Sequence, residues 1–311
     1  TDTPSEPELL YTPIVYSMSN GGKRLRPTLL LAAYNIFADD MAKALPAATA
    51  IEMFHNFTLL HVDIMDNPDV RRGKPSVKAQ WGDNVAILSG DAMLIKAYQM
   101  LQSVSSNQFP LLLQLFSQTA MEVCEGQQYD VDFESQEHVT IEEYLKMIRL
   151  KTSVLLATAL QIGSYLAGAN EAQQEALYQF GINIGLAFQI QDDILDVWGD
   201  PKTFGKAVGG DISCNKKTFV YLTALHQATQ SYTTPYPTTQ LQQWYSQVLE
   251  DNTEKIAAVK EIFERLGVRP LCELVVDDYT NKALELLNQL PQNAATEQLR
   301  QLANKLTTRK D

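Results

Sequence analysis

The sequence predicts an all-helical protein. Apolar residues recur at spacings of three and four along five long segments, and sustained alternation of apolar and polar residues is scarce. The 311 residues include only 15 glycines and 13 prolines, which argues against a loop-rich chain. Hydrophobic residues make up 45% of the chain, enough for a substantial core.

The first helical segment runs over residues 46–66. It places Ile51, Phe54 and Thr58 on one face, and Pro46 fits the first turn of a helix. The same period predicts four further helical segments, at residues 82–104, 140–168, 171–200 and 252–290.

Two signals interrupt the helical pattern. Gly267 and Pro270 predict a break inside the last segment, and the Thr- and Pro-rich stretch 229–240 predicts the clearest loop. Helical pattern resumes directly behind that loop. We therefore expect a single domain over residues 1–311, a large helical bundle with several nearly all-apolar helices buried at its centre.

Charge and cysteine content exclude some classes of protein. A net charge of −12 argues against a nucleic-acid binder. The three cysteines, Cys124, Cys214 and Cys272, are widely spaced without metal-ligand spacing, which indicates a reduced, cytoplasmic setting. No apolar stretch approaches the roughly 20 residues of a transmembrane helix, and no basic-then-apolar signal peptide opens the chain.

Two predicted helices end in acidic residues. Asp192 and Asp196 lie one turn apart and share a helix face, as do Asp63 and Asp66. Neighbouring carboxylates repel each other, and a hard cation removes that cost; Mg²⁺ suits a small set of oxygen ligands and is often shared with substrate phosphates. A solvated acidic helix end is the alternative interpretation, but two such clusters favour metal sites.

Basic residues accompany the acidic clusters: one group precedes the first cluster, and one group follows each cluster. Arginine and lysine bind phosphate oxygens, so alternating anionic and cationic groups indicate a site for a polyanionic phosphate. No glycine stretch matches a Walker A loop. Taken alone, "GGKRLRP" is equally consistent with a solvated surface turn. The basic residues concerned are Lys23, Arg24, Arg26, Arg71, Arg72, Lys206, Lys216 and Lys217.

With these motifs in order, the chain resembles the trans-isoprenyl diphosphate synthases. The resemblance covers about residues 20–225. It rests on "GGKRLRP", "HNFTLLHVDIMDNPDVRRGKP", "GQQYDVDFE", "LKTSVLLA", "FQIQDDILD" and "GKAVGGDISCNKKTF".

The resemblance implies an isoprenoid-synthase fold around a deep central cavity, and a homodimer. It implies that Asp63, Asp66, Asp192 and Asp196 hold Mg²⁺ on an allylic diphosphate. Residues matching Lys23, Arg26, His55 and Arg72 hold isopentenyl diphosphate, and those matching Arg71, Lys151 and Lys206 hold the allylic diphosphate. Lys216 is a further candidate for substrate binding.

The catalytic candidates are Lys151, Thr152 and Gln189. The resemblance implies that the oxygen dipoles of Thr152 and Gln189 face the allylic cation. Without it, His55 would be interpreted as a core histidine and Lys151 as a lysine at a helix end. Asp130 and Asp132 are expected to partner a lysine or a water.

Val62 departs from the family's first aspartate motif, since the family has a metal-binding aspartate there. Valine cannot coordinate a metal. The favoured interpretation is an active synthase with weakened metal binding. A non-catalytic partner subunit and a class I terpene cyclase, or a prenyltransferase with another acceptor, are the alternatives, although "DDILD" argues against a cyclase. An engineered valine would look the same in the sequence.

Phe57 and Phe54 are the candidates for controlling product length. They lie five and eight residues before position 62, and one helical turn spans about 5.4 Å, close to one isoprene unit. In relatives, an aromatic residue five before the motif accompanies a C20 product. We expect geranylgeranyl diphosphate, with farnesyl diphosphate as the runner-up; ordinary core packing is the alternative role of both rings.

Overall fold

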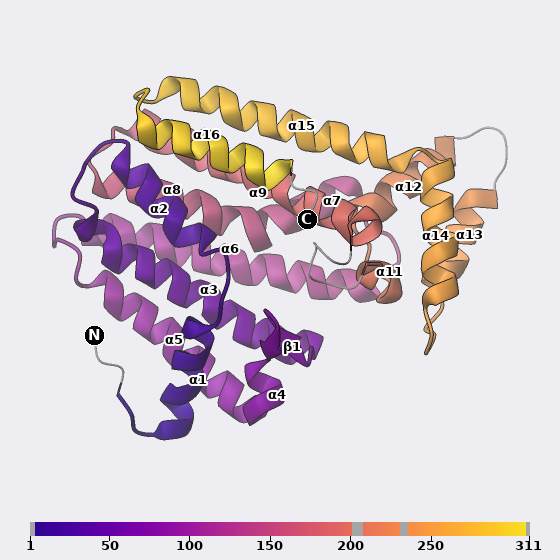
Figure 1. The fold of residues 1–311 in the computed structure, drawn as a ribbon, viewed down its shortest axis with the longest axis horizontal. Helices are drawn as coiled ribbons and strands as arrows, with labels where there is room; N and C mark the ends of the chain where they lie inside the picture. Colours follow the sequence, from indigo (N-terminus) through magenta and orange to yellow (C-terminus); the bar gives the residue numbers. More distant parts are fainter. Residues whose placement is uncertain (1–3, 201–207, 231–235, 309–311) are drawn as a thin grey trace. The chain divides into compact units, whose positions relative to one another are not determined.

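The computed structural model describes residues 4–200, 208–230 and 236–308, and they are almost entirely helical (Figure 1). The all-α prediction is therefore confirmed. The chain divides into two compact units, residues 1–117 with 158–174, and residues 118–157 with 175–311. One domain over residues 1–311 stays a prediction. Among the described helices, none is both long and apolar enough to cross a bilayer.

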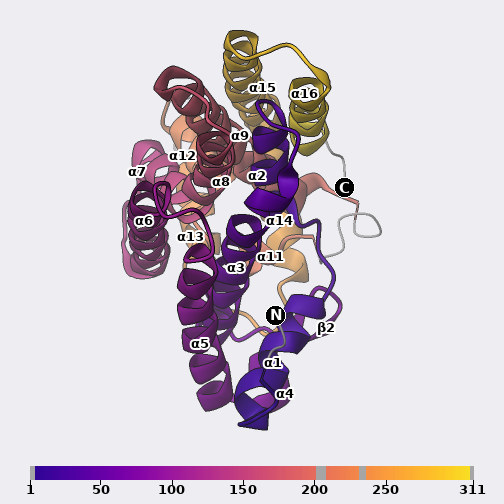
Figure 2. The ribbon, with the colours of Figure 1, turned by 90° about the vertical axis from the view of Figure 1, so that its left-hand side faces the viewer.

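The first unit is organised around one long helix. This helix, α3 (Leu45–Asp66), packs along α5 (Asp83–Leu101) and against α2 (Leu25–Asn35), as Figure 2 shows for α3 and α5. The unit also contains α1 (Glu8–Ser19), a 3₁₀ turn (Met41–Ala44), the hairpin β1 (Val70–Arg71) and β2 (Lys74–Pro75), α4 (Val77–Trp81) and the first turns of α6 (Phe109–Ser135).

The core of the first unit contains an aromatic cluster and one close approach of two helices. Phe54 is buried, and its ring meets Phe116 edge to face with centroids 5.3 Å apart. Gly163 of α8 (Val154–Leu166) lies so close to α2 that a Cβ would stand 2.1 Å from the Leu30 carbonyl oxygen. A larger residue at position 163 would separate the two helices.

The second unit contains the other helices. They are the rest of α6, α7 (Ile141–Ile148), a π-helical turn (Arg149–Ser153), the start of α8, α9 (Glu171–Trp198), α11 (Gly210–Ser213), α12 (Phe219–Gln230), α13 (Tyr236–Tyr245), α14 (Thr253–Arg265), α15 (Val268–Leu286), a 3₁₀ turn (Leu287–Gln289) and α16 (Ala294–Thr307).

Three glycines bring the helices of the second unit close together. A Cβ on Gly126 would lie 2.2 Å from the Lys151 amide nitrogen, and one on Gly185 would lie 2.5 Å from the Ser153 hydroxyl. Gly181 meets Ala157 in the same way. The π-helical turn is therefore held between α6 and α9 at backbone contact distance.

Most predicted segments coincide with helices. The predicted segment 46–66 corresponds to α3, and 82–104 corresponds to α5. The segment 140–168 covers α7 to α8, and 171–200 corresponds to α9. Gly267 separates α14 from α15 as expected. The prediction of a loop over residues 229–240 was partly wrong. Residues 229–230 end α12 and residues 236–240 begin α13, because Pro237 fits a first helical turn; residues 231–235 lie outside the described residues.

Candidate active site

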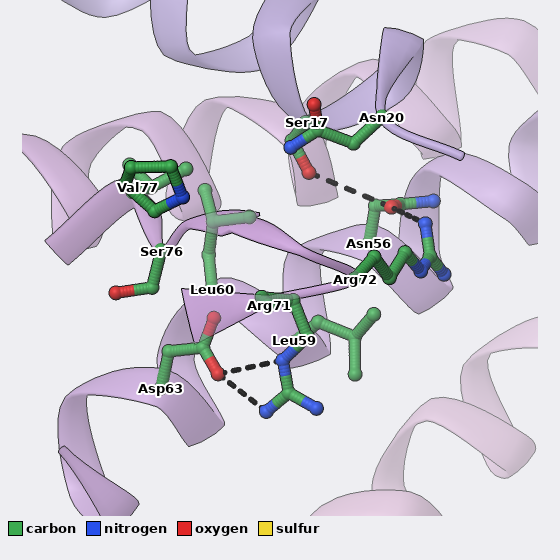
Figure 3. A pocket seen from close by; sticks show the side chains of 11 residues that line it. Ser17, Asn20, Asn56, Leu59, Leu60, Asp63, Arg71, Arg72, Ser76 and Val77 are labelled. Atoms are coloured by element: carbon green, nitrogen blue, oxygen red, sulfur yellow. Dashed lines mark hydrogen bonds and ion pairs between the residues drawn. The ribbon is translucent and has the colours of Figure 1, made fainter. Parts of the chain in front are cut away.

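A polar pocket in the first unit lies between the end of α1, the C-terminal half of α3 and the hairpin (Figure 3). Ser17 comes from α1 and Asn20 directly follows it, and α3 contributes Asn56, Leu59, Leu60 and Asp63. Arg71, Arg72, Pro75, Ser76 and Val77 complete the lining. Three of the predicted site residues, Asp63, Arg71 and Arg72, thus meet in one pocket.

The hairpin turn aims Arg72 into this pocket. Arg72 and Gly73 both have positive φ, 56° and 76°, as a two-residue type I′ turn requires. A left-handed arginine is a strained choice, and such strain concentrates at functional positions. Gly22 makes room for it, because a Cβ there would lie 2.8 Å from the Arg72 guanidinium carbon. The second glycine of "GGKRLRP" therefore has a steric reason, whereas a Cβ on Gly21 would meet no atom within 4 Å.

Arg26 and His55 form a second pair of predicted site residues. Arg26 Nη1 lies 3.1 Å from His55 Nε2, and since arginine donates, Nε2 accepts and Nδ1 carries the ring proton. Burial, followed by the charge of Arg26, holds the pKa of His55 well below its usual value. Burial also lowers the pKa of Arg26 to about 10, so its guanidinium remains charged at neutral pH.

This pair leaves donors and acceptors for a ligand. Within the described residues, Arg26 Nε and Asn20 Oδ1 are buried without a hydrogen-bond partner. Buried unpaired polar atoms are costly and rare in native proteins. Arg24 differs, because it is bound to Glu52 and to the carbonyl oxygens of Met18 and Asn20 at 2.5 and 2.9 Å. Arg24 is therefore a structural residue.

The acidic end of α3 offers few free ligands. Asp63 is 3% exposed, and its Oδ1 accepts from Arg71 Nε at 2.9 Å and from Arg71 Nη2 (Figure 3). Asp66 is exposed, and Val62 has no oxygen. Lys78 Nζ lies 3.4 Å from the Ile64 carbonyl oxygen, where a cation is favoured at the end of a helix.

The middle aspartate at the end of α9 is likewise held by the protein. Asp193 is buried; its Oδ2 accepts from the Tyr144 hydroxyl at 2.6 Å and from the Phe219 amide at 3.0 Å. Its Oδ1 accepts from Gln189 Nε2 at 3.3 Å. Burial and the charge of Asp211 raise the pKa of Asp193 well above its usual value, while the three hydrogen bonds act in the opposite direction.

Asp192 and Asp196 are the outer carboxylates of this cluster. Asp192 is half-buried and Asp196 is buried. The turn that begins at Gly209 closes on Asp196, because the Asp211 amide donates to its Oδ2 at 3.0 Å and the Gly209 amide donates to its carbonyl at 2.6 Å. No group of three or more His, Cys, Asp or Glu side chains is assembled for a metal within either described unit.

The π-helical turn carries Lys151 and Thr152. A π-turn is rare and is frequently found at functional sites, because the extra residue redirects side chains. Lys151 Nζ donates to Asp130 Oδ2 at 2.5 Å, which confirms the expected lysine partner of Asp130. The Thr152 hydroxyl donates to Gln189 Oε1 at 3.3 Å.

These bonds order the dipoles around Thr152. The Gln189 amide donates to Asp193 Oδ1, so its oxygen faces Thr152 and receives the hydroxyl proton. The oxygen lone pairs of Thr152 remain available for a cation. Neither Asp193 nor Tyr144, whose partner lies 49 residues away, was predicted as a site residue; the middle carboxylate in "QDDILD" was the available signal.

The lysines of the other motifs are placed differently. Lys23 and Lys216 are exposed, and Lys206 lies outside the described residues. Lys217 donates to the Phe133 carbonyl oxygen at 2.7 Å, which secures the end of α6.

Glu52 and Asn56 were not predicted as site residues. A glutamate within the apolar run "IEMF" was the available signal of a buried charge, and its Oε1 accepts from Asn56 Nδ2 at 2.9 Å.

Phe57 and Phe54 pack against each other on α3. Their ring centroids are 5.5 Å apart, and Phe57 meets His61 edge to face at 4.8 Å. Phe54 is 1% exposed and Phe57 is 8% exposed. Both rings therefore belong to the packed interior of the first unit, with Phe57 nearer its boundary.

Comparisons with known proteins identify the family of this chain. A model of the polyprenyl synthetase family matches residues 7–266. A short chain isoprenyl diphosphate synthase of Methanocaldococcus jannaschii is 46% identical over 217 residues, 70% of this chain and 66% of that protein. One from Methanothermobacter thermautotrophicus is 36% identical over 300 residues, 96% of this chain and 90% of that protein.

Solved structures give the same result. A geranylgeranyl pyrophosphate synthase is 45% identical with a TM-score of 0.93, over 99% of this chain and 94% of that one. The geranylgeranyl pyrophosphate synthetase of Pyrococcus horikoshii Ot3 is 34% identical with a TM-score of 0.90, over 98% and 92%. The chain thus belongs to the polyprenyl synthetase family. It is an enzyme, a transferase of the prenyl diphosphate synthase class.

Proposed function

We propose that this chain condenses isopentenyl diphosphate with an allylic diphosphate to make a short-chain trans-prenyl diphosphate. The observation that carries the proposal is the concentration of arginines near His55. The charges of Arg26, Arg72 and Arg71 all lower the pKa of His55, and among the described residues the Arg26 Nε donor is buried without a partner. A diphosphate would accept from such a donor. Lys23 and Arg71 supply further charge nearby in the sequence.

In the proposed reaction the allylic C–O bond breaks and leaves a carbocation and a diphosphate. The double bond of isopentenyl diphosphate attacks the cation, a C–C bond forms, and the released diphosphate takes the proton that is lost. Thr152 and Gln189 stabilise the cation with fixed oxygen dipoles, which need no reorganisation. Lys151, Lys206 and Lys216 are proposed to stabilise the leaving diphosphate.

The carboxylates at the end of α9 fit Mg²⁺. Asp192 and Asp196 provide hard oxygen donors, and the turn at Gly209 fixes the Asp196 carboxylate. When bound, Mg²⁺ would neutralise charge on the leaving diphosphate. The end of α3 fits less well, because Val62 has no oxygen and Asp63 is bound by Arg71. Asp63 and Asp66 stay proposed ligands.

A direct assay tests the function. Purified protein is incubated with isopentenyl diphosphate, Mg²⁺ and each of three allylic primers, dimethylallyl, geranyl and farnesyl diphosphate, and the prenyl products are measured. The alternative function, a non-catalytic subunit of another synthase, is based on the missing carboxylate at Val62. Absence of elongation with every primer would support that alternative.

Phe57 is proposed to end chain growth at C20. Phe57→Ala should shift the products to longer chains, because it shortens the side chain one turn before the motif. Full packing around Phe57 would make the same change cost about 3–5 kcal/mol of stability. Mass spectrometry of the products decides, and Phe116→Leu, in the same aromatic cluster, controls for repacking. An unchanged distribution in a folded, active Phe57→Ala variant would place the chain-length determinant elsewhere.

A homodimer is proposed through α5. Ile87, Leu88 and Ile95 are 40%, 60% and 59% exposed on this helix, an unusual concentration of large apolar side chains. We propose that a second copy of this chain covers these side chains. Leu88→Glu with Ile95→Glu should halve the mass measured by light scattering, whereas a monomeric parent protein would refute the proposal.

A further inference from the structure

Lys255 is a fully buried lysine to which no proposed step assigns a role. It lies in the first turns of α14 and has 0% exposure. Lysine is almost never fully buried without a partner. In the described part of the chain its ammonium meets no carboxylate. A buried charge of this kind must be compensated by hydrogen bonds.

Two oxygens compensate the ammonium. Lys255 Nζ donates to Asn215 Oδ1 at 2.6 Å and to the Gln247 carbonyl oxygen at 3.0 Å. Asn215 Nδ2 donates to the same Gln247 carbonyl at 3.1 Å, which closes a ring of three hydrogen bonds. The Tyr245 ring lies 6.0 Å from the ammonium, at the limit of a cation–π contact.

Asn215 is the residue that this ring fixes. It has a left-handed backbone, with φ of 57°, a conformation that asparagine tolerates better than most residues. It ends the turn that starts at Gly209 and is followed directly by Lys216, whose amide donates to the Asp211 carbonyl at 2.9 Å. The direction in which the chain enters Lys216 therefore depends on Asn215.

The other end of the same turn is also held by α14. Ile256 packs on Gly209 so closely that a Cβ there would lie 2.7 Å from its side chain. Between these two contacts, the turn donates its Gly209 and Asp211 amides to Asp196. Two consecutive residues of α14 thus support both ends of the turn that holds the Asp196 carboxylate.

We propose that Lys255 is a positioning residue: through Asn215 it fixes the turn that orients Asp196 and Lys216 toward the diphosphate. This inference rests on the proposed function for its chemistry, but the contacts that carry it belong to one unit. Without the ammonium, Asn215 is released and the amides that bind Asp196 lose their support.

Two variants test the proposal by different routes. Lys255→Met keeps the length of the side chain and removes the donor. Asn215→Gly permits the left-handed backbone and removes the link, so it carries the test should Lys255→Met fail to fold. Lys260→Met, on the same helix, is the matched control.

Two readouts separate positioning from a merely structural role. Amide hydrogen exchange over residues 208–216 should accelerate about tenfold in both variants, and the Mg²⁺ concentration for half-maximal rate should rise about tenfold, with the KM for isopentenyl diphosphate unchanged. A lower Tm with unchanged exchange and unchanged Mg²⁺ dependence would overturn the proposal. A parent protein without prenyl-transfer activity would refute the proposed function alone, because hydrogen exchange still reports on Lys255.

Discussion

The acidic ends of α3 and α9 share a buried middle aspartate but differ in their outer positions. In each, the middle aspartate is buried and bound by the protein: Asp63 by Arg71, and Asp193 by Tyr144, Gln189 and the Phe219 amide. The outer positions are those proposed to bind a metal. At the end of α9 both outer positions are aspartates, whereas at the end of α3 the first is Val62.

This difference indicates that the aspartates within one motif have two different roles. The inner carboxylate orients neighbouring side chains, namely an arginine at one end and a glutamine at the other. The outer carboxylates are suited to cations. Because Val62 removes only an outer carboxylate, the inner network of the first unit is left in place.

The largest expected effect is at the intact cluster. Asp192→Ala should lower turnover by at least about 100-fold, since loss of even an indirect metal contact costs about 10–100-fold. Steady-state product formation at saturating substrates measures the loss. Asp277→Ala, at an exposed carboxylate of α15, is the control. Equal activity of the Asp192 variant and the parent would remove the end of α9 from the site.

Completing the acidic cluster at the end of α3 should raise turnover, the opposite of the effect of Asp192→Ala. Val62→Asp should raise turnover and lower the Mg²⁺ concentration for half-maximal rate by about tenfold, because it restores a carboxylate one turn before Asp66. Titration of activity with Mg²⁺ measures both. Val62→Asn, which adds a neutral oxygen, should give a smaller gain. An unaltered Mg²⁺ curve in Val62→Asp would mean that position 62 does not face the metal.

The inner network of α9 can be weakened without touching a carboxylate. Tyr144→Phe removes one donor to the buried Asp193 and should cost about 1–3 kcal/mol in the free energy of unfolding, the range for a buried group that loses its hydrogen-bond partner. Urea denaturation measures the cost. Tyr279→Phe on α15 should change stability by less than about 0.5 kcal/mol. Equal effects of the two substitutions would show that the Tyr144 hydroxyl contributes nothing.

The smallest effect concerns pH and belongs to the first unit. The pKa of His55 is depressed in the folded protein, so below about pH 6.5 the unfolded chain binds a proton that the folded chain does not. Stability should therefore fall as the pH is lowered from 7 to 5, by up to about 2 kcal/mol from this residue. His55→Gln should flatten the dependence by that amount in urea titrations at both pH values. An identical pH slope in the variant would exclude His55 as its source.

Sequence patterns predicted the helices because burial of one helical face is a local, periodic property. α3, α5 and α9 follow directly from it. The site was predicted only as a set of residue types. The pairing of Asp63 with Arg71 depends on a hairpin turn, and that of Tyr144 with Asp193 joins residues 49 positions apart. The π-helical turn also has no signal in "RLKTS", because it is held by close backbone contact at Gly126 and Gly185.

That π-helical turn has a consequence for insertions and deletions. One extra residue in a helix rotates everything beyond it by about 100° relative to an uninterrupted α-helix. Removing one residue from Arg149–Ser153 would straighten the helix, but it would turn Tyr144 away from Asp193 or Thr152 away from Gln189. The length of this segment is therefore coupled to side chains on both sides of it. A designed sequence must therefore preserve the number of residues in this segment as well as Lys151 and Thr152.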